Sequence, residues 1–549
     1  MSGDAAPPAG GNLEAALAAW RRDLGDDHVV TAAAVLDRYA RSTIGRPVRA
    51  AAVLMPATQA EVVAAVKTAA QHCVPLYPIS RGKSWGYGDA CPVTAGNVIL
   101  DLSRMNRIRE VDPALAYAVI EPGVTQGQLS EHLRAQGIAL WPDCTGAGPD
   151  TSIVGNILDR GFGHTPYGNR AQYISGLEIV LADGRVLRTG FGHFDMARSS
   201  HLFPYGIGPA LDGLFVQSSL GIVTAIGIWL MPEPEAYSFF ICSLERDEDI
   251  AAFVDDLRPL RLDGTVRSVI HMGNDLRVIS GGMSFPRDRF PDRRSLPQEF
   301  RDGLRKSGGI GAWMIAGGLY GSKGVVAAAR REVRRRLAGP RRKLHFFDRG
   351  RLDMLDRLSR PLSGMRRVAA LRSKLASLRA VYDMNRGIPS HRFLAGAYWR
   401  NRAGMPADFS TADPAEDGCG LLWFPPVLPF TGAAVKEFLG LAEPIFARYD
   451  FDFFVTFSSV TERALGAVMT IAYDLQDEAE SAAALDCANA LCETMMRAGF
   501  PPYRVSPPFL PYLAQGSETY WDVVAGMKRL LDPDDILSPG RYRPTAQQP

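Results

Sequence analysis

The chain has 549 residues, enough for about two to four domains of ordinary size. Hydrophobic residues make up 46% and charged residues 22%, values that are typical of globular proteins and exclude a mainly disordered, collagenous or coiled-coil chain. The formal net charge of +2 gives no global argument for nucleic-acid binding, and we expect no nucleic-acid partner.

The seven cysteines are scattered, with no Cys-x-x-Cys and no histidines at zinc-site spacing. We therefore expect no disulfide scaffold, no metal site and a reducing, cytoplasmic location. The N-terminus lacks the pattern of a secretory signal, and no apolar run reaches about 18 residues, so we also expect no membrane span.

In chain order, a Pro/Ala/Gly-rich arm of about a dozen residues comes first, and we expect it to be frayed. Thr58 followed by Glu61 forms a capping box that predicts a helix start. Asp183-Gly184 between two apolar runs predicts a β-hairpin. Strands and helices alternate in the first part, which indicates an α/β arrangement. The other expected elements are helices with breaks over 13–45, strands at 51–55, 74–80, 97–103, 117–123, 177–190 and 451–460, a helix end, a turn and a long strand within 214–232, a helix over 480–499 ended by Gly499, and a short helix followed by a tail within 527–544.

Residues 330–379 carry 15 Arg and 2 Lys against 4 acids, a local charge of +13. A solvated helical face is one interpretation of this basic segment. Docking to an acidic partner or an anionic surface is the other, and interleaved apolar residues also allow an interfacial helix.

Two glycine-rich loops, 78–92 and 142–170, follow apolar runs. Closely spaced glycines let a backbone approach a phosphate and direct several N–H groups at it, although an ordinary turn explains one such loop equally well. Neither a Walker A loop nor a helix-opening G-x-G-x-x-G is present in the first loop. Two such loops in one domain suggest a pyrophosphate between them.

Seven motifs follow one another along the chain: PISRGKSWGYG (78–88), EPGVTQGQL (121–129), SIVGNILDRGFGHTPYG (152–168), SGLEIVLADGRVLRTG (175–190), SSLGIVTAIGIWLMP (218–232), PYRV (502–505) and DPDDILSPGR (532–541). By the order and spacing of these motifs the chain resembles the FAD-dependent vanillyl-alcohol oxidase / p-cresol methylhydroxylase family. The resemblance implies an α+β fold, with a two-subdomain FAD-binding domain of the p-cresol methylhydroxylase type and an α/β cap domain with a central antiparallel sheet. It places the first part of the FAD domain at 1–235, the cap at 236–500 and a C-terminal segment that completes the FAD domain at 501–549.

The resemblance also implies site residues. Tyr87, Tyr503 and Arg504 match the residues that bind a phenol oxygen, and charge-assisted hydrogen bonds from them would stabilise a phenolate. The residues expected along FAD are Pro78, Ile79, Ser80, Arg81, Gly82, Lys83, Ser84, Tyr87, Gly88, Thr145, Gly146, Ser152, Gly155, Asn156, His164, Thr165, Gly221, Ile222, Val223 and Arg541. The substrate pocket is expected at Ala147, Tyr398, Arg400, Gly420 and Trp423, with His391, Arg392 and Trp399 as further candidates.

Two departures from the family pattern stand out. Gly420 occupies the position where a His or Tyr tethers the flavin, which predicts non-covalent FAD, with Cys419 and Tyr398 as alternative tethers. Ala147 occupies the position of an acidic residue that activates water, with Asp143 and Asp150 on either side. Cys144 matches a second tether of some relatives, but without the histidine they also need we expect it to be a packed thiol.

The resemblance therefore implies an FAD-dependent oxidase or dehydrogenase that oxidises a para-substituted phenol or a related aromatic alcohol by hydride transfer to flavin N5. The second hypothesis is a tailoring enzyme of secondary metabolism that acts on a larger aromatic substrate. The third hypothesis is a catalytically idle flavin-binding or partner-binding protein. The electron acceptor is expected to be O2 or a redox protein such as a cytochrome. The resemblance also implies a homodimer.

Overall fold

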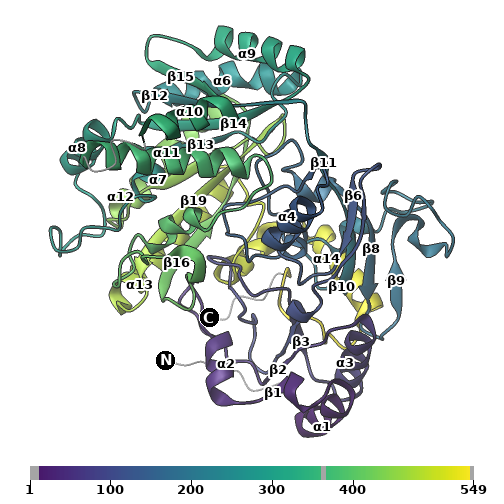
Figure 1. The fold of residues 1–549 in the computed structure, drawn as a ribbon. Coiled ribbons are helices and arrows are strands. Elements are labelled where there is room, and N and C mark those ends of the chain that lie inside the picture. Colours follow the sequence, from purple (N-terminus) through teal and green to yellow (C-terminus); the bar gives the residue numbers. More distant parts are fainter. Residues whose placement is uncertain (1–11, 360–365, 544–549) are drawn as a thin grey trace.

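The protein is described by a computed structural model over residues 12–359 and 366–543. The expected N-terminal arm, residues 360–365 of the basic segment and the last six residues lie outside this range. The described residues form a four-stranded and a five-stranded sheet in the N-terminal part, a separate two-stranded pair, and one eight-stranded sheet. The part with the smaller sheets and the part with the large sheet lie side by side (Figure 1). No helix in the described ranges has the length and apolar character needed to cross a bilayer.

The first sheet has the strand order β1-β2-β4-β3, with β2, β4 and β3 parallel and β1 antiparallel to β2. The capping box at Thr58 is confirmed, because its hydroxyl accepts a hydrogen bond from the Glu61 backbone N–H at 3.2 Å. That helix, α3, crosses between β2 and β3 and packs on α1, where Trp20 donates to the Ala65 carbonyl. The bounds are α1 Leu13–Leu24, β1 Val29–Val30, α2 Ala33–Tyr39, β2 Ala52–Leu54, α3 Gln59–Gln71, β3 Leu76–Ile79 and β4 Val98–Asp101.

The second sheet is antiparallel, with the order β5-β6-β10-β8-β9. The predicted hairpin joins β8 and β9, and Gly184 in its turn has a φ of +81°, a conformation that favours glycine. The bounds are β5 Ile108–Asp112, β6 Tyr117–Ile120, α4 Gln126–Ala135, β7 Leu140–Trp141, α5 Ile153–Leu158, β8 Ile174–Val180, β9 Val186–Arg188, β10 Ile222–Trp229 and β11 Met231–Pro232.

The third sheet is antiparallel throughout, as expected for the cap, and has the order β15-β12-β14-β13-β18-β19-β16 with β17 added to β19. Helices α6, α9, α12 and α13 cover one face and share its hydrophobic core. The predicted boundary near 235 falls just before β12, and the division into domains stays a prediction. The bounds are β12 Ala236–Leu244, α6 Asp249–Leu262, β13 His271–Asn274, α7 Asp275–Ile279, α8 Gln298–Gly308, β14 Trp313–Gly321, α9 Lys323–Leu337, β15 Arg342–Phe347, α10 Arg349–Ser359, α11 Arg366–Met384, β16 Cys419–Phe424, β17 Val427–Pro429, α12 Gly432–Arg448, β18 Phe454–Ser458, β19 Ala464–Asp474 and α13 Glu478–Arg497.

The C-terminal segment returns to the first two sheets, where Figure 1 draws it in yellow beside β10. Lys528 is buried and donates to the carbonyl oxygens of Ser219 and Leu537, each at 2.8 Å. Leu537 also bridges to Leu76 at the start of β3. The helix expected within 527–544 is α14, Glu518–Leu531, so its predicted start was wrong; its early turns carry exposed polar residues that hide the pattern.

Candidate active site

Hydrogen bonds fix the loop that follows β3 to the segment that follows α2. The Gly86 backbone N–H donates to the Thr43 hydroxyl at 2.7 Å, and the buried Asp89 carboxylate accepts from the Thr43 N–H at 2.7 Å. Gly86 has a φ of +74°, and a Cβ atom there would overlap the Trp423 ring. Glycine is therefore required at Gly86 both for its backbone conformation and for the close approach of the cap.

The three residues predicted to bind a phenol oxygen lie together. The Arg504 guanidinium is 3.8 Å from the centre of the Tyr87 ring and donates to the Ser84 hydroxyl at 2.7 Å. The Gln217 amide donates to the Tyr503 carbonyl at 2.9 Å and so fixes the backbone that carries the pair. The Tyr87 hydroxyl is buried and makes no hydrogen bond of good geometry to any described residue, although it is close enough to Tyr503 for each phenol to affect the other's pKa.

The electrostatics of this cluster keep both tyrosines protonated. Burial raises the pKa of Tyr503 to about 12, while Arg504 opposes the shift. Burial and the neighbouring Tyr503 raise the pKa of Tyr87 well above its usual value. Burial disfavours the charge on Arg504, but Asp159 and the two tyrosines outweigh it, so the pKa of Arg504 is raised. The cluster thus presents two hydroxyl donors and one cation.

Asp159 is a site residue that the sequence did not reveal. It follows α5, forms an ion pair with Arg504, accepts a hydrogen bond from Tyr542, and lies 3.8 Å from the Arg541 guanidinium. One carboxylate therefore connects the predicted phenol site to the C-terminal segment. Its sequence neighbourhood, NILDRG, carries no signal for such a role.

The backbone of the first glycine-rich loop suits a dinucleotide phosphate. None of the N–H groups of residues 81–85 donates to another described residue, so five successive donors are free. Ser80 packs against Gly155 of α5, and a Cβ atom at Gly155 would lie 3.1 Å from the Ser80 hydroxyl oxygen. This loop and α5 are therefore in contact. One terminal nitrogen of Arg541 is buried without a partner. These residues fit FAD.

The side chains of other residues predicted along FAD pack against or bond to protein residues, and the role of these residues in binding FAD stays a prediction. Ile222 and Val223 are buried in two hydrophobic cores and pair with Val180 and Ile179 of β8. The Thr165 hydroxyl donates to Asp143 at 2.7 Å, and Asn156 accepts from Arg170 at 2.8 Å.

The two acids beside Ala147 are already engaged. Asp143 accepts from the Thr165 backbone N–H and from Arg170, which lies 2.8 Å away and is itself buried. Asp150 is half exposed and lies 3.1 Å from His391. Neither offers a free carboxylate at this loop.

The region of the predicted tether is tightly packed. A Cβ atom at Gly420 would lie 2.5 Å from the Tyr473 carbonyl oxygen, so this backbone has no room for a larger residue. Burial raises the pKa of the Cys419 thiol to about 12, and Tyr398 donates to Asp417. Cys144 is fully buried, and burial raises its pKa, which suits the packed thiol that we expected.

Histidines line another part of the site. The rings of His164 and His271 are 4.0 Å apart, and His271 bonds the Ser458 hydroxyl at 2.9 Å. Burial lowers the pKa of His271 to about 4 and that of His164 well below its usual value, so both are neutral at pH 7. Phe162 lies between His271 and Tyr503, with ring centres 6.1 and 5.7 Å away. The sequence did not single out His271, which lies in a short strand without a motif.

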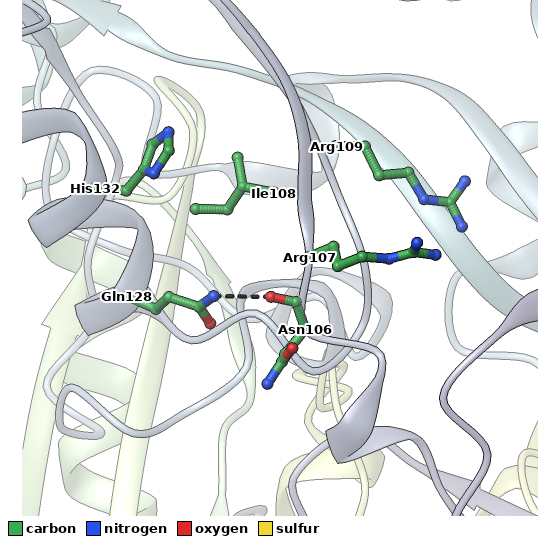
Figure 2. Close-up of a pocket in the computed structure, with 6 residues that line it drawn as sticks. All are labelled: Asn106, Arg107, Ile108, Arg109, Gln128 and His132. Carbon is green, nitrogen blue, oxygen red and sulfur yellow. Dashed lines mark hydrogen bonds between the residues drawn. The ribbon is translucent and has the colours of Figure 1, made fainter. Parts of the chain in front are cut away.

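Arg400 and the surface depression in Figure 2 lie outside the cluster of Tyr87, Tyr503 and Arg504. The Arg400 guanidinium is buried in a two-bond ion pair with Glu480, at 2.7 and 2.9 Å. The depression has a volume of about 510 Å³, and no residue predicted for the site lines it. The structure describes no group of three potential metal ligands within its two ranges. The depression is lined by Asn106, Arg107, Ile108, Arg109, Gln128 and His132.

We expect Asp89 to make the stability of this region pH-dependent. Burial raises its pKa to about 7, whereas an aspartate in an unfolded chain titrates near 4. The folded protein therefore binds the extra proton, and its stability falls as the pH rises from about 4 through about 7. The apparent melting temperature should fall over that range in the native chain and change less in Asp89→Asn, whose amide oxygen keeps the accepting role. Equal slopes would contradict this assignment.

Comparisons with known proteins agree with this geometry. A protein-family model described as "FAD binding domain" matches residues 50–190. The chain is 37% identical over 533 residues to 1'-carboxy-chondrochloren decarboxylase of Chondromyces crocatus, covering 96% of this chain and 97% of that protein. It is 31% identical over 538 residues to the 4-cresol dehydrogenase [hydroxylating] flavoprotein subunit of Pseudomonas putida, covering 97% and 95%.

Solved structures show the same likeness over the whole chain. The structure of p-cresol methylhydroxylase with substrate bound has a TM-score of 0.86 at 28% identity and covers 98% of both chains. The isoeugenol complex of 4-ethylphenol oxidase from Gulosibacter chungangensis has a TM-score of 0.87 at 25% identity and covers 99% of both chains. Fold and comparisons together define an FAD-dependent oxidoreductase. The chain belongs to the p-cresol methylhydroxylase / vanillyl-alcohol oxidase family, as its motifs indicated.

Proposed function

We propose that this enzyme oxidises a para-substituted phenol at the carbon attached to the ring. The observation that carries the proposal is the cluster of Tyr87, Tyr503 and Arg504, in which an arginine lies 3.8 Å from a buried tyrosine whose hydroxyl lacks a partner. A phenol oxygen is the acceptor that such a set of donors needs.

The chemistry follows from these charges. Tyr87 and Tyr503 donate hydrogen bonds to the substrate oxygen, and Arg504 stabilises it as a phenolate. Negative charge on that oxygen pushes electrons toward the para carbon and weakens the benzylic C–H bond. Bound FAD supplies the hydride acceptor, and the substrate leaves as a quinone methide or its water adduct. FAD would be held by the free N–H groups of residues 81–85, by Ser80 and α5, and by Arg541.

A panel of related compounds tests this proposal. We expect para-alkylphenols to be oxidised, whereas their methyl ethers and meta isomers should not be, because an ether cannot form a phenolate and a meta substituent cannot form a quinone methide. Equal turnover of the methyl ethers would contradict the proposal. No turnover of any phenol by flavin-loaded enzyme would favour the idle flavin-binding protein instead.

The second candidate is a tailoring enzyme that acts on a larger aromatic substrate. The 37% identity to 1'-carboxy-chondrochloren decarboxylase, over nearly the full length of both chains, favours it. Product masses separate the two functions, because loss of carbon dioxide from a larger para-hydroxyphenyl substrate distinguishes decarboxylation from simple oxidation.

We infer that FAD is bound without a covalent link, because the packing around Gly420 leaves no room for a tether there and the thiol of Cys419 stays protonated. Precipitation of the holoenzyme with acid should leave the yellow colour in the supernatant. Colour in the pellet would contradict non-covalent binding, and mass spectrometry of flavin-bearing peptides would then identify the attachment residue.

We infer that a redox protein or O2 reoxidises the flavin, and the basic segment suits an acidic protein. Three of its cations pair with acids of neighbouring elements, Asp249, Asp256 and Glu245, whereas Arg331 and Arg334 on α9 are exposed without an ion pair to a described residue. Charge reversal at Arg334, Arg335 and Arg336 should slow reduction of an acidic cytochrome and leave flavin reduction unchanged. An unaffected cytochrome rate would contradict docking at this segment.

A further inference from the structure

The core helices cover one face of the large sheet, and a second, smaller hydrophobic cluster that includes Phe454 and Trp423 lies on the other. Directly paired residues of neighbouring strands project to the same side, and Trp423, Thr470 and Phe454 form such a row across β16, β19 and β18. Their neighbours along the strands, including Leu422 and Met469, belong to the hydrophobic core on the other side. Trp423 therefore lies on the face opposite the core helices, 5.8 Å from Tyr87 between ring centres.

Arg277 of α7 lies over this same row. Its Nη2 atom donates to the Thr470 hydroxyl at 2.8 Å and to the Val468 carbonyl at 3.0 Å, and its guanidinium is 5.6 Å from the centre of the Phe454 ring. Its Nε atom is buried and has no partner, and no acid within the described ranges pairs with Arg277. A partly buried guanidinium whose Nε atom is enclosed and has no carboxylate partner is costly, so an anion supplied from outside would complete the site.

Electrostatics connect Arg277 with the phenol site. Burial lowers the pKa of Arg277 to about 10, and the only opposing influence comes from Tyr87, so the two groups are neighbours. Arg277 remains a cation at pH 7. Tyr87 thus contacts the Arg504 guanidinium, which has the carboxylate partner Asp159, and it also contacts Trp423. Trp423 pairs with Thr470, the residue to which Arg277 donates, and no described carboxylate pairs with Arg277.

Unpartnered donors gather at the same place. The Tyr87 hydroxyl, the Trp423 indole N–H and the Nε atoms of Arg277 and Arg504 are all buried without a hydrogen-bond acceptor. A phenol oxygen provides acceptors for one part of this set, at Tyr87 and Arg504. The Trp423 indole N–H and the Arg277 Nε–H then need a second group of acceptors, and the two oxygens of a carboxylate offer one to each.

We propose that Arg277, with Trp423 beside it, binds a carboxylate of the substrate, so that the substrate is a para-substituted phenol whose side chain carries an acid group. This inference rests on the proposed phenol oxidation and adds its substrate class. A phenol end at Tyr87, Tyr503 and Arg504 and an acid end at Arg277 would fix both ends of one molecule.

The test compares two substrates of equal length, para-hydroxyphenylpropanoate and para-propylphenol, with the native holoenzyme and Arg277→Met. Native enzyme should prefer the acid in kcat/KM by about 100-fold, and Arg277→Met should lose that preference while para-propylphenol changes less than about threefold. Binding of the acid, followed by the change in the flavin absorption spectrum, should weaken by a similar factor. Arg497→Met, at an arginine of α13 whose side chain is 75% exposed, is the matched control and should behave as native.

Each other result is informative. Equal kcat/KM for the two compounds in native enzyme overturns the carboxylate site and leaves phenol oxidation standing. Equal losses for both substrates in Arg277→Met would show that the arginine serves the flavin or the phenol instead. Flavin reduction by neither compound overturns the proposed function, while the spectral titration still decides whether the acid binds through Arg277. If Arg277→Met does not retain flavin, Arg277→Lys keeps the charge without the fork and should show an intermediate loss for the acid alone.

Discussion

Replacing Arg504 with glutamine should lower kcat/KM for a para-alkylphenol by about 100- to 1,000-fold, a loss of about 3–4 kcal/mol of transition-state stabilisation. The guanidinium lies 3.8 Å from the centre of the Tyr87 ring, and its positive charge is placed to stabilise a developing phenolate. Because the phenolate charge is needed for the chemical step, the loss should appear in the rate of flavin reduction rather than in substrate binding alone. Anaerobic rapid mixing measures that rate directly.

Two controls make this result specific. Arg497→Gln removes an exposed arginine, 75% accessible and paired only with Glu493 in the next helical turn, and should leave the rate unchanged. The flavin content of Arg504→Gln must match that of the native enzyme, since Arg504 also binds Asp159 near the C-terminal segment. A rate within about threefold of native would contradict the assigned role.

The second large effect is expected at the two tyrosines. Tyr87→Phe and Tyr503→Phe should each slow flavin reduction by about 10- to 100-fold, because each removes one hydrogen bond to a charged oxygen. The double variant should lose less than the product of the two single effects, since both hydroxyls stabilise one atom.

The pH dependence supplies an independent check on these residues. With the pKa of Tyr503 raised to about 12, its hydroxyl remains a donor throughout the ordinary working range, so no loss of activity should arise from a group titrating near 10. Tyr205→Phe, at a tyrosine that is 62% exposed, is a matched control that should react at the native rate. If the losses in flavin-reduction rate of Tyr87→Phe and Tyr503→Phe multiply fully in the double variant, the idea that both hydroxyls stabilise one oxyanion is contradicted.

Features that depend on neighbouring residues could be predicted from the sequence. The capping box at Thr58, the hairpin at Asp183-Gly184 and the helix ended by Gly499 each rest on a few adjacent positions, and all three are present. The family motifs extended this to the antiparallel cap sheet and to the meeting of Tyr87 with Arg504. The Ser84 hydroxyl and the Arg504 guanidinium that it accepts from are 420 positions apart, a contact that spacing alone does not indicate.

The residues that were missed act through long-range contacts. Asp159, His271 and Arg277 gain their significance only from partners on other elements, or from the lack of one. Conversely, Arg400 carries the charge expected of a pocket residue, but the buried Glu480 pairs with it, and a sequence does not show such a pairing. A sequence pattern can indicate which charged residue lies in a region, whereas the fold decides which acid or base pairs with that residue.

The most direct test of the account is anaerobic mixing of the flavin-loaded enzyme with para-ethylphenol and, separately, with its methyl ether. The account predicts that the phenol bleaches the visible flavin absorption in a single turnover and that the ether leaves it unchanged, because only the phenol can become the anion held by Tyr87, Tyr503 and Arg504. Bleaching by both compounds, or by neither, would contradict it.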